Sequence, residues 1–228
     1  MHTKNLTIRV IARGSPLSRV QVQEVASELS ALGITVDFDI TWVETQGDRD
    51  KATSLRHMDK SNFFTLEIDD LLLGGKGDIA VHSAKDLPEP LPDGLEIIAL
   101  TRGVDPSDAL VLPEDLRLEE LPAGAAIGTS SVRREEAVRK LRSDLSFVDI
   151  RGTIGERLAQ LDEGSVQGVV IAEAALIRLG LTKRNRMTLP GNTTPFQGQL
   201  AIVARGGDTE MRDLFRCIDV REEAVPHA

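Results

Sequence analysis

Apolar and polar residues alternate along two early segments of the chain, and a helical period separates the two. Residues 6–13 and 35–43 follow the period of two that is typical of strands. Between them, Ser15 and Pro16 mark a helix start, because serine caps helices and proline suits the first helical position. Apolar residues then recur at helical spacing until Gly33. The chain therefore opens strand–helix–strand, which favours a parallel sheet with a right-handed crossover.

The alternation of strand and helix patterns continues through the rest of the sequence. Residues 46–62 are polar without a clear period and predict an exposed loop. Further strands are expected at 78–83, 95–102, 125–131, 146–152, 166–172 and 198–205, and helices at about 63–73, 132–142, 153–164 and 173–180. We expect an α/β protein of two lobes with parallel or mixed sheets and a cleft between them. The first lobe would be discontinuous, with residues 1–102 and 197–228, and the second would contain residues 103–196.

The composition is that of a globular protein with an acidic balance. Hydrophobic residues make up 41% of the 228 residues, and the formal net charge is −9. Nonspecific nucleic-acid binders need a basic surplus, so this class is disfavoured. The single cysteine, Cys217, fits a reducing compartment, and we find neither a secretory signal nor a run long enough for a membrane helix. We expect a cytoplasmic monomer that binds neither nucleic acid nor membranes.

Basic and hydroxyl side chains follow four of the predicted strands at their carboxyl ends. In open parallel sheets ligands bind at this edge, where helix N-termini also point. The residues concerned are Arg13, Ser15, Lys85, Thr129, Ser130, Ser131, Arg133, Arg134, Arg151 and Arg157. Guanidinium groups hold carboxylates or phosphates through paired hydrogen bonds. The pattern therefore predicts a site for a ligand with several negative charges, and an acid, Asp86, stands among these residues.

Each of these residues has a simpler explanation when it is taken alone. A single arginine near a helix start is most often a solvated surface charge, and Ser15, Thr129 and Ser131 could be ordinary helix caps. Asp86 could cap the turn that follows it. Four strand ends with the same sign of charge are a poor fit to chance, so we favour the ligand site.

Other classes of site lack their sequence signatures. The sequence contains neither GxxxxGK[ST] nor GxSxG, and no GxGxxG follows the first strand. We expect His82 to be half-buried with its hydrogen bonds satisfied. No other His, Cys or carboxylate lies at metal-ligand spacing, so we expect no metal site.

Four stretches resemble the hydroxymethylbilane synthase family, also called porphobilinogen deaminases. They are IARGSPLS at 11–18, HSAKDLP at 82–88, GTSSVRR at 128–134 and IRGTIGERLAQLDEG at 150–164. The resemblance covers about residues 8–205 and implies two periplasmic-binding-protein-like lobes. Family members are transferases of haem and tetrapyrrole biosynthesis. They join four porphobilinogens head to tail, with loss of ammonia, on a dipyrromethane primer that is bound to a cysteine.

The resemblance also implies roles for particular residues. Asp86 stands at the position of the family's catalytic carboxylate, with Lys85 beside it. The arginines at the strand ends match those that bind the acetate and propionate groups of the growing chain, and the hydroxyl residues match hydrogen-bonding positions. Further binding positions implied by the family alone are Phe64, Arg178 and Gln199.

The sequence departs from the family pattern near its end. The family's third domain normally follows about residue 220 and carries the anchor cysteine after two glycines, whereas this sequence stops at Ala228. We therefore expect a shortened form without that domain, in which Cys217 is a buried structural cysteine rather than the anchor. Residues 59–62 also lack the usual glycine- and lysine-rich stretch. Two alternatives to the enzyme remain open. One is a binder of porphobilinogen or tetrapyrroles without catalysis, and the other is a solute receptor of a transport system.

Overall fold

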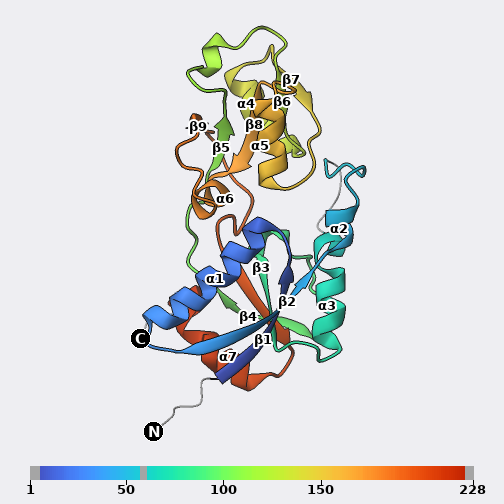
Figure 1. The fold of residues 1–228 in the computed structure, drawn as a ribbon, viewed down its shortest axis with the longest axis vertical. Helices are drawn as coiled ribbons and strands as arrows, with labels where there is room; N and C mark the ends of the chain where they lie inside the picture. The colour runs from blue at the N-terminus through green and yellow to red at the C-terminus, as the bar shows by residue number, and fades with distance from the viewer. Residues whose placement is uncertain (1–5, 57–60, 224–228) are drawn as a thin grey trace. The chain divides into compact units, whose positions relative to one another are not determined.

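The structure, a computed structural model, describes residues 6–56 and 61–223 and divides into two compact units (Figure 1). Among the described residues, unit 1 contains 6–49, 61–103 and 199–223, and unit 2 contains 50–56 and 104–198. The sequence prediction differs at residue 103, which it assigned to the second lobe, and at residues 197–198 and the segment 50–56, which it assigned to the first. Polar contacts hold this segment on unit 2, and a hydrophobic period does not reveal such contacts. Both units are α/β with mixed sheets, as the sequence predicted.

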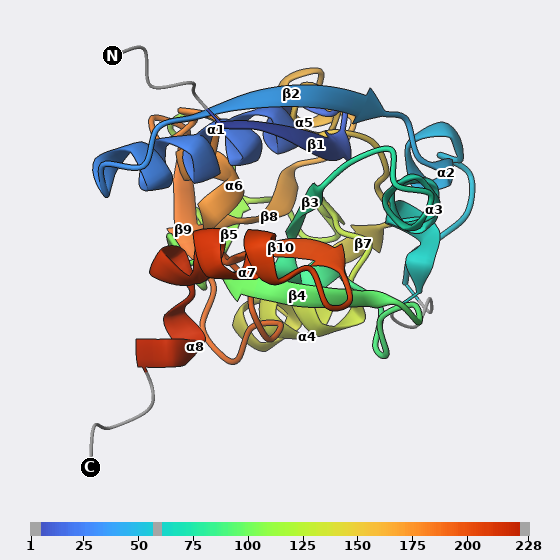
Figure 2. The ribbon, with the colours of Figure 1, turned by 90° about the horizontal axis from the view of Figure 1, so that it is seen from below.

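Unit 1 is built on a five-stranded sheet. Its strands, in spatial order, are β2 (Val36–Val43), β1 (Leu6–Arg13), β3 (Ile79–Ser83), β10 (Leu200–Arg205) and β4 (Leu95–Leu100). The first three are parallel, and β10 runs antiparallel to β3 and β4. Helices α1 (Pro16–Ala31) and α7 (Thr209–Phe215) pack on one face of the sheet, and α3 (Leu66–Leu73) packs on the other (Figure 2).

Unit 2 repeats this plan with shorter elements. Its strands, in spatial order, are β7 (Ser146–Val148), β6 (Ala126–Gly128), β8 (Gly168–Ala172), β5 (Asp108–Val111) and β9 (Arg186–Thr188). Strand β6 is parallel to β7 and β8, whereas β5 is antiparallel to β8 and β9. The helices are α4 (Val132–Leu141), α5 (Ile154–Asp162) and α6 (Glu173–Arg178). Val138 of α4 packs in the core with Leu110 and Ile127.

The local sequence explains where the main elements begin and why the central strands look apolar. Ser15 caps α1, since its side chain accepts a hydrogen bond from the Ser18 backbone N–H, and Pro16 opens the helix as predicted. Thr153 caps α5 in the same way and forms a capping box with Glu156. Strands β3 and β8 are buried on both faces, so their sequences read as apolar runs rather than as alternation.

Several predicted boundaries are wrong. The predicted loop 46–62 contains a short helix, α2 (Gln46–Arg49), and part of a 3₁₀ helix (Asn62–Phe64), and α3 begins only at Leu66. Gly47 is buried beneath the Phe64 ring, where a Cβ would lie 2.3 Å from a ring carbon. This packing is a tertiary contact that the local pattern cannot show. Residues 57–60 of that loop lie outside the described residues. The prediction also lacks β5, β9 and α7.

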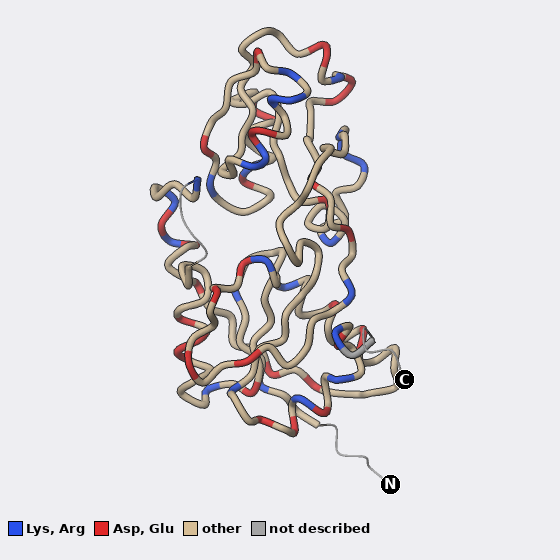
Figure 3. The backbone as a smooth tube through the Cα atoms, turned by 180° about the vertical axis from the view of Figure 1, so that it is seen from behind, with Lys and Arg blue, Asp and Glu red and all other residues tan. Residues whose placement is uncertain are grey.

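Basic and acidic positions intermingle along the backbone of each unit (Figure 3). Whether a basic candidate residue contributes net positive charge therefore depends on its acidic partners. Among the residues that the structure describes, no helix has both the length and the apolar character needed to cross a membrane.

Candidate functional site

The candidate residues of unit 1 lie at one edge of its sheet. Strands β1 and β3 are parallel and therefore end at the same edge, where β10 begins because it is antiparallel. Leu200, the first residue of β10, pairs with Ser83, the last of β3. This edge therefore brings together the segments that carry Arg13 and Ser15, Lys85 and Asp86, and Gln199.

Arg13 is fixed by two partners within unit 1. Its guanidinium forms an ion pair with Asp48, with 3.2 Å between Nε and Oδ2, and lies 4.6 Å from the centroid of the Phe64 ring. The buried Thr45 also donates to Asp48 through its hydroxyl, at 2.8 Å. Burial alone would raise the pKa of the Asp48 carboxyl, but the hydrogen bond and charge of Arg13, together with the hydrogen bonds from Thr45, outweigh this effect and lower the pKa. Phe64 thus holds Arg13 in place at this edge.

Asp86 is presented to solvent by a short 3₁₀ helix (Ala84–Asp86) that follows β3 directly. Ala84 and Leu87 are buried on either side of it, whereas the Asp86 side chain is exposed and Lys85 is half-buried. The Ala84 N–H donates to the Gln199 carbonyl at 3.0 Å. The turn is therefore anchored by its neighbours, and the Asp86 carboxylate takes no part in holding it.

A buried glutamine lies behind this turn. Gln21 of α1 donates through Nε2 to the Ser83 hydroxyl at 2.8 Å, and Gln199 donates to the Thr101 carbonyl at 3.0 Å. Sequence reasoning missed Gln21. Its position on the first turns of α1, beside apolar core positions, was the available signal.

His82 differs from the expectation of a half-buried, satisfied histidine. It is 5% exposed, and its Nε2 has no hydrogen-bond partner. Burial and the charge of Arg13 lower the pKa of His82 from 6.5 to about 4. The imidazole is therefore neutral at neutral pH. As the last but one residue of β3, which is central in the sheet, His82 has no room to reach solvent.

We expect His82 to make the protein sensitive to mild acid. Because the pKa of the folded state lies near 4 and that of the unfolded chain near 6.5, the unfolded state binds the proton first. Stability that is present above pH 6.5 is then lost as the pH falls towards 4, by about 3 kcal/mol at most. The free energy of unfolding of wild type and His82→Asn, measured by urea denaturation from pH 7 to 4.5, should converge as the pH falls.

Asp69 supplies a control with the opposite sign. It is buried in α3 and accepts a hydrogen bond from the Thr65 hydroxyl at 2.6 Å. Burial raises the pKa of Asp69 to about 6. The folded protein therefore binds this proton more tightly than the unfolded chain does, and wild type loses stability as the pH rises towards 6. Asp69→Asn should remove this pH dependence. If the difference in the free energy of unfolding between wild type and His82→Asn stayed constant with pH, this would contradict the assignment of the acid sensitivity to His82.

The candidate arginines of unit 2 surround a buried carboxylate. Asp108, at the start of β5, is 2% exposed and accepts from Arg133 Nη2 and Arg134 Nη2, both at 2.6 Å, and from Gln197 Nε2 at 3.0 Å. Burial would raise the pKa of Asp108, but the two guanidinium groups lower it. The cluster therefore holds two positive charges against one negative charge. This surplus favours an anionic ligand.

The two arginines of this cluster differ in exposure. The Arg134 side chain is 13% exposed and that of Arg133 is 33% exposed. Arg133 also donates to the Asn192 carbonyl at 2.9 Å. Sequence reasoning missed Asp108 and Gln197. Asp108 directly precedes the apolar residues of β5, and this position was the one signal in the sequence for a buried charge.

The hydroxyl residues after β6 serve mainly the local backbone. Thr129 is buried, and its Oγ1 accepts from the Ser131 N–H at 3.2 Å. Ser130 donates to the Ile150 carbonyl. Ser131 occupies the N-cap position of α4, but its side chain makes no capping hydrogen bond. The simpler explanation of Ser131 as an ordinary cap therefore does not hold.

The remaining candidate arginines of unit 2 each bind a backbone carbonyl. Arg151 donates to Asp50 at 2.8 Å, Arg157 to Gly152 at 2.9 Å, and Arg178 to Gly198 at 2.8 Å. The contact of Arg151 helps to hold the segment 50–56 on unit 2. Further contacts of this segment are the ion pairs Lys51–Glu156 and Arg56–Glu135. Hydrogen bonds from Lys51 and Thr153 lower the pKa of Glu156 to about 2.

The candidate residues thus form two groups, one in each unit. The unit 1 group contains Arg13, Ser15, Phe64, Lys85, Asp86 and Gln199. The unit 2 group contains Thr129, Ser130, Ser131, Arg133, Arg134, Arg151, Arg157 and Arg178. A site in a cleft between the lobes stays a prediction.

Cys217 contradicts the expectation of a cysteine buried in a helix. It lies in a 3₁₀ helix (Arg216–Ile218) at the surface, and its thiol contacts the Leu214 carbonyl at 3.4 Å. Burial of part of the group raises the pKa of the Cys217 thiol. Since the thiolate is the nucleophile, this surrounding does not activate it.

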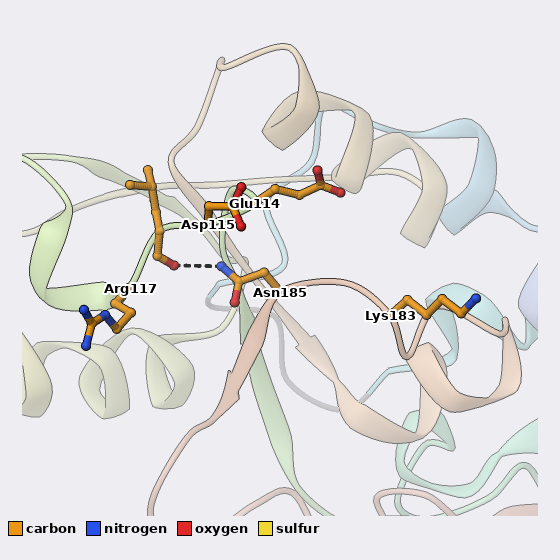
Figure 4. A pocket seen from close by; sticks show the side chains of 6 residues that line it. Glu114, Asp115, Arg117, Lys183 and Asn185 are labelled. Carbon is orange, nitrogen blue, oxygen red and sulfur yellow. Dashed lines mark hydrogen bonds between the residues drawn. The ribbon is translucent and has the colours of Figure 1, made fainter.

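A hollow of about 390 Å³ lies elsewhere in unit 2 (Figure 4). It is lined by Glu114, Asp115, Leu116, Arg117, Lys183 and Asn185. Asn185 donates to the Leu116 and Pro113 carbonyls at 2.7 and 2.6 Å, so its amide holds the adjoining backbone. The hollow contains none of the candidate residues.

Solved structures define the class of fold. The chain is similar to an ABC-transporter periplasmic substrate-binding protein from Coxiella burnetii, with a TM-score of 0.55 and 16% identity over 92% of this chain and 91% of that one. It is also similar to a pheromone-precursor lipoprotein from Enterococcus faecalis, with a TM-score of 0.57 and 14% identity over 93% and 90% of the two chains. The fold is therefore that of the periplasmic-binding-protein class, as predicted.

Sequence comparison defines the family within this class. Residues 8–213 match the family model described as porphobilinogen deaminase, dipyromethane cofactor binding domain. The chain is 38% identical to porphobilinogen deaminase from Nostoc sp., over 93% of this chain and 68% of that protein. It is 38% identical to a probable porphobilinogen deaminase from Pyrobaculum neutrophilum, over 98% and 77%. The chloroplastic enzyme from Euglena gracilis is 36% identical over 96% of this chain and 48% of its own length. The chain belongs to the porphobilinogen deaminase family, which confirms the resemblance.

Proposed function

We propose that the protein is a transferase that joins porphobilinogen molecules head to tail to give hydroxymethylbilane. The observation that carries this proposal is the position of Asp86 in a chain of this family. An exposed carboxylate stands at the sheet edge where Arg13 is held by its ion pair with Asp48. A protein that only binds acidic ligands gains no affinity from a carboxylate among its basic residues. It suits a reaction in which an acidic ligand develops a positive charge.

The chemistry requires that one carbon–nitrogen bond breaks for each carbon–carbon bond that forms. The protonated amino group of the aminomethyl substituent leaves as ammonia and takes the electron pair of the carbon–nitrogen bond, so the methylene carbon becomes electron-poor. The free α-carbon of the acceptor pyrrole attacks this carbon and then loses its proton. The Asp86 carboxylate would accept hydrogen bonds from the pyrrole N–H groups and stabilise the positive charge on the substrate. Lys85, next to it, would bind a carboxylate of the ligand.

The basic residues would bind the acetate and propionate groups of the pyrroles. Each porphobilinogen carries two carboxylates, so the growing chain accumulates negative charge. In unit 2, the surplus positive charge around Asp108 can offset part of this charge, with Arg133 as the more exposed donor. Arg151, Arg157 and Arg178 each donate to a backbone carbonyl, and each guanidinium carries five N–H donors in all. Ser131, free of a capping role, can add a hydroxyl.

These unit 2 residues also fit the dipyrromethane cofactor that the family model names. The cofactor bears four carboxylates, and the donors of unit 2 are guanidinium and hydroxyl groups, which suit them. When bound, the cofactor supplies the free pyrrole position from which the chain grows. Cys217 does not fit as the covalent anchor, because burial raises the pKa of its thiol and the thiol contacts the Leu214 carbonyl, which does not favour the thiolate.

We further propose that the protein works as a monomer in the cytoplasm, without nucleic-acid or membrane partners. The support is the acidic net charge of −9 and the small size of its proposed substrate. Size exclusion of the protein used in the assay below gives its oligomeric state.

We expect the purified chain to consume porphobilinogen and to release one ammonia for each molecule consumed. The product should cyclise to uroporphyrin on standing, and absorbance and mass spectrometry identify it. The intact mass of the protein, measured first, tells whether two pyrrole units are attached. Heat-denatured protein and buffer are the controls. Protein that is folded, carries the extra mass and yet forms no product would be a binder, and the proposal would fail.

A further inference from the structure

Phe196 combines two unusual features in unit 2. Its side chain is 45% exposed, and its backbone φ is +60°, in the left-handed region that residues other than glycine rarely adopt. Strained backbone of this kind persists only where the surrounding structure imposes it, and it gathers at functional sites. An exposed aromatic ring on such a backbone therefore needs an explanation.

The residues after Phe196 are held tightly. Gln197 is buried and donates to the carbonyls of Pro106 and Ser107, at 2.7 and 3.0 Å, as well as to Asp108. Gly198 lies so close to Asp105 that a Cβ would be 2.5 Å from the Asp105 carbonyl oxygen. The chain after the ring is therefore fixed.

The residues before Phe196 are held as well, and candidate arginines of unit 2 take part on both sides. Arg133 binds the Asn192 carbonyl upstream, and Arg178 binds the Gly198 carbonyl downstream. The Gln197 N–H donates to the Thr194 carbonyl at 3.2 Å, which closes the turn around Phe196. The position of the ring is thus coupled to the same guanidinium groups that would bind carboxylates.

We propose that Phe196 is a specificity-determining residue that stacks on a pyrrole ring of the acidic ligand. This inference rests on the proposed function. Its neighbour Gln197 donates to Asp108, whose two arginines give surplus positive charge, while the Phe196 side chain is 45% exposed. Guanidinium groups beside a fixed aromatic ring recognise a planar ring that bears carboxylates, and aromatic pairs add binding energy beyond the area that they bury.

The test compares two small probes, because porphobilinogen itself would react. One is a pyrrole dicarboxylate without an aminomethyl group, and the other is glutarate, which has two carboxylates and no ring. Binding to the purified chain is measured by calorimetry for wild type, Phe196→Leu and Phe196→Tyr. Phe196→Leu should weaken binding of the pyrrole probe about 3- to 10-fold. It should leave glutarate binding unchanged, and Phe196→Tyr should retain the wild-type affinity.

Leu141→Ala serves as the matched control, because Leu141 is an exposed apolar residue at the end of α4. It should bind both probes as wild type does. Equal affinity of wild type and Phe196→Leu for the pyrrole probe would overturn the inference, and so would an equal loss for both probes, which indicates a structural role. If wild type binds neither probe and consumes no porphobilinogen, the proposed function fails as well. If wild type does consume porphobilinogen, a negative result with Phe196→Leu overturns the inference alone.

Discussion

Asp86→Asn is expected to lower the kcat for porphobilinogen by roughly 100- to 1000-fold, the effect typical of removing one electrostatic contact to a developing charge. Asparagine keeps the size of the side chain and removes the negative charge. The positive charge that develops on the substrate as ammonia leaves then has no carboxylate to stabilise it. Initial rates of ammonia release at saturating porphobilinogen measure the effect.

The fold should be unchanged in this variant, so the loss will report chemistry. Asp86 is exposed, and its turn is anchored by buried Ala84 and Leu87 and by the hydrogen bond from Ala84 to Gln199. The melting temperature should stay within about 2 °C of wild type, since surface substitutions rarely change stability by more than about 0.5 kcal/mol. Asp93→Asn is the matched control, because Asp93 is an exposed aspartate in the same β3–β4 connection. Retention of more than a tenth of the activity by Asp86→Asn would refute the role given to Asp86.

The strand ends were the part of the site that the sequence could predict. A buried strand leaves an apolar run, and the residue types that follow it are visible in the sequence. Arg13, Asp86 and Arg133 became candidates in this way. The structure places Arg13 at the end of β1, Asp86 in the 3₁₀ helix after β3 and Arg133 in the first turn of α4. Most elements were also predictable, because they depend on local period and on helix caps such as Ser15, but β5, β9 and α7 were missed.

The partners of the basic residues were not predictable. Asp48 lies 35 positions from Arg13, and Asp108 lies 26 positions from Arg134. Pairings over such distances depend on how the elements pack, and the packing leaves no local period. For the same reason the burial of His82 was underestimated, because it depends on the strands on both sides of β3. The pattern of one chain therefore shows which groups can bind a ligand, but not which of their charges are already compensated.

Of the substitutions proposed for this protein, Asp108→Asn is expected to lower the free energy of unfolding most, by about 3–5 kcal/mol. It leaves two guanidinium groups without their buried counter-charge. Asp108 is 2% exposed and Arg134 is 13% exposed, so water cannot replace the carboxylate. The folded-state pKa of Asp108 is lowered, so its contribution is present above about pH 4 and is lost at lower pH. The free energy of unfolding in urea at pH 7 measures the loss.

Asp144→Asn is the matched control, because Asp144 also binds an arginine through two hydrogen bonds but lies at the surface. Arg142 Nε and Nη2 each lie 2.7 Å from its oxygens, and its side chain is 42% exposed. Exposed ion pairs contribute about 1 kcal/mol or less, so this variant should be nearly as stable as wild type. If both variants lost the same small amount, the Asp108 cluster would be no more than a surface pair. It could then neither fix the segment around Phe196 nor hold Arg133 ready for a carboxylate, because both depend on a counter-charge that water cannot reach.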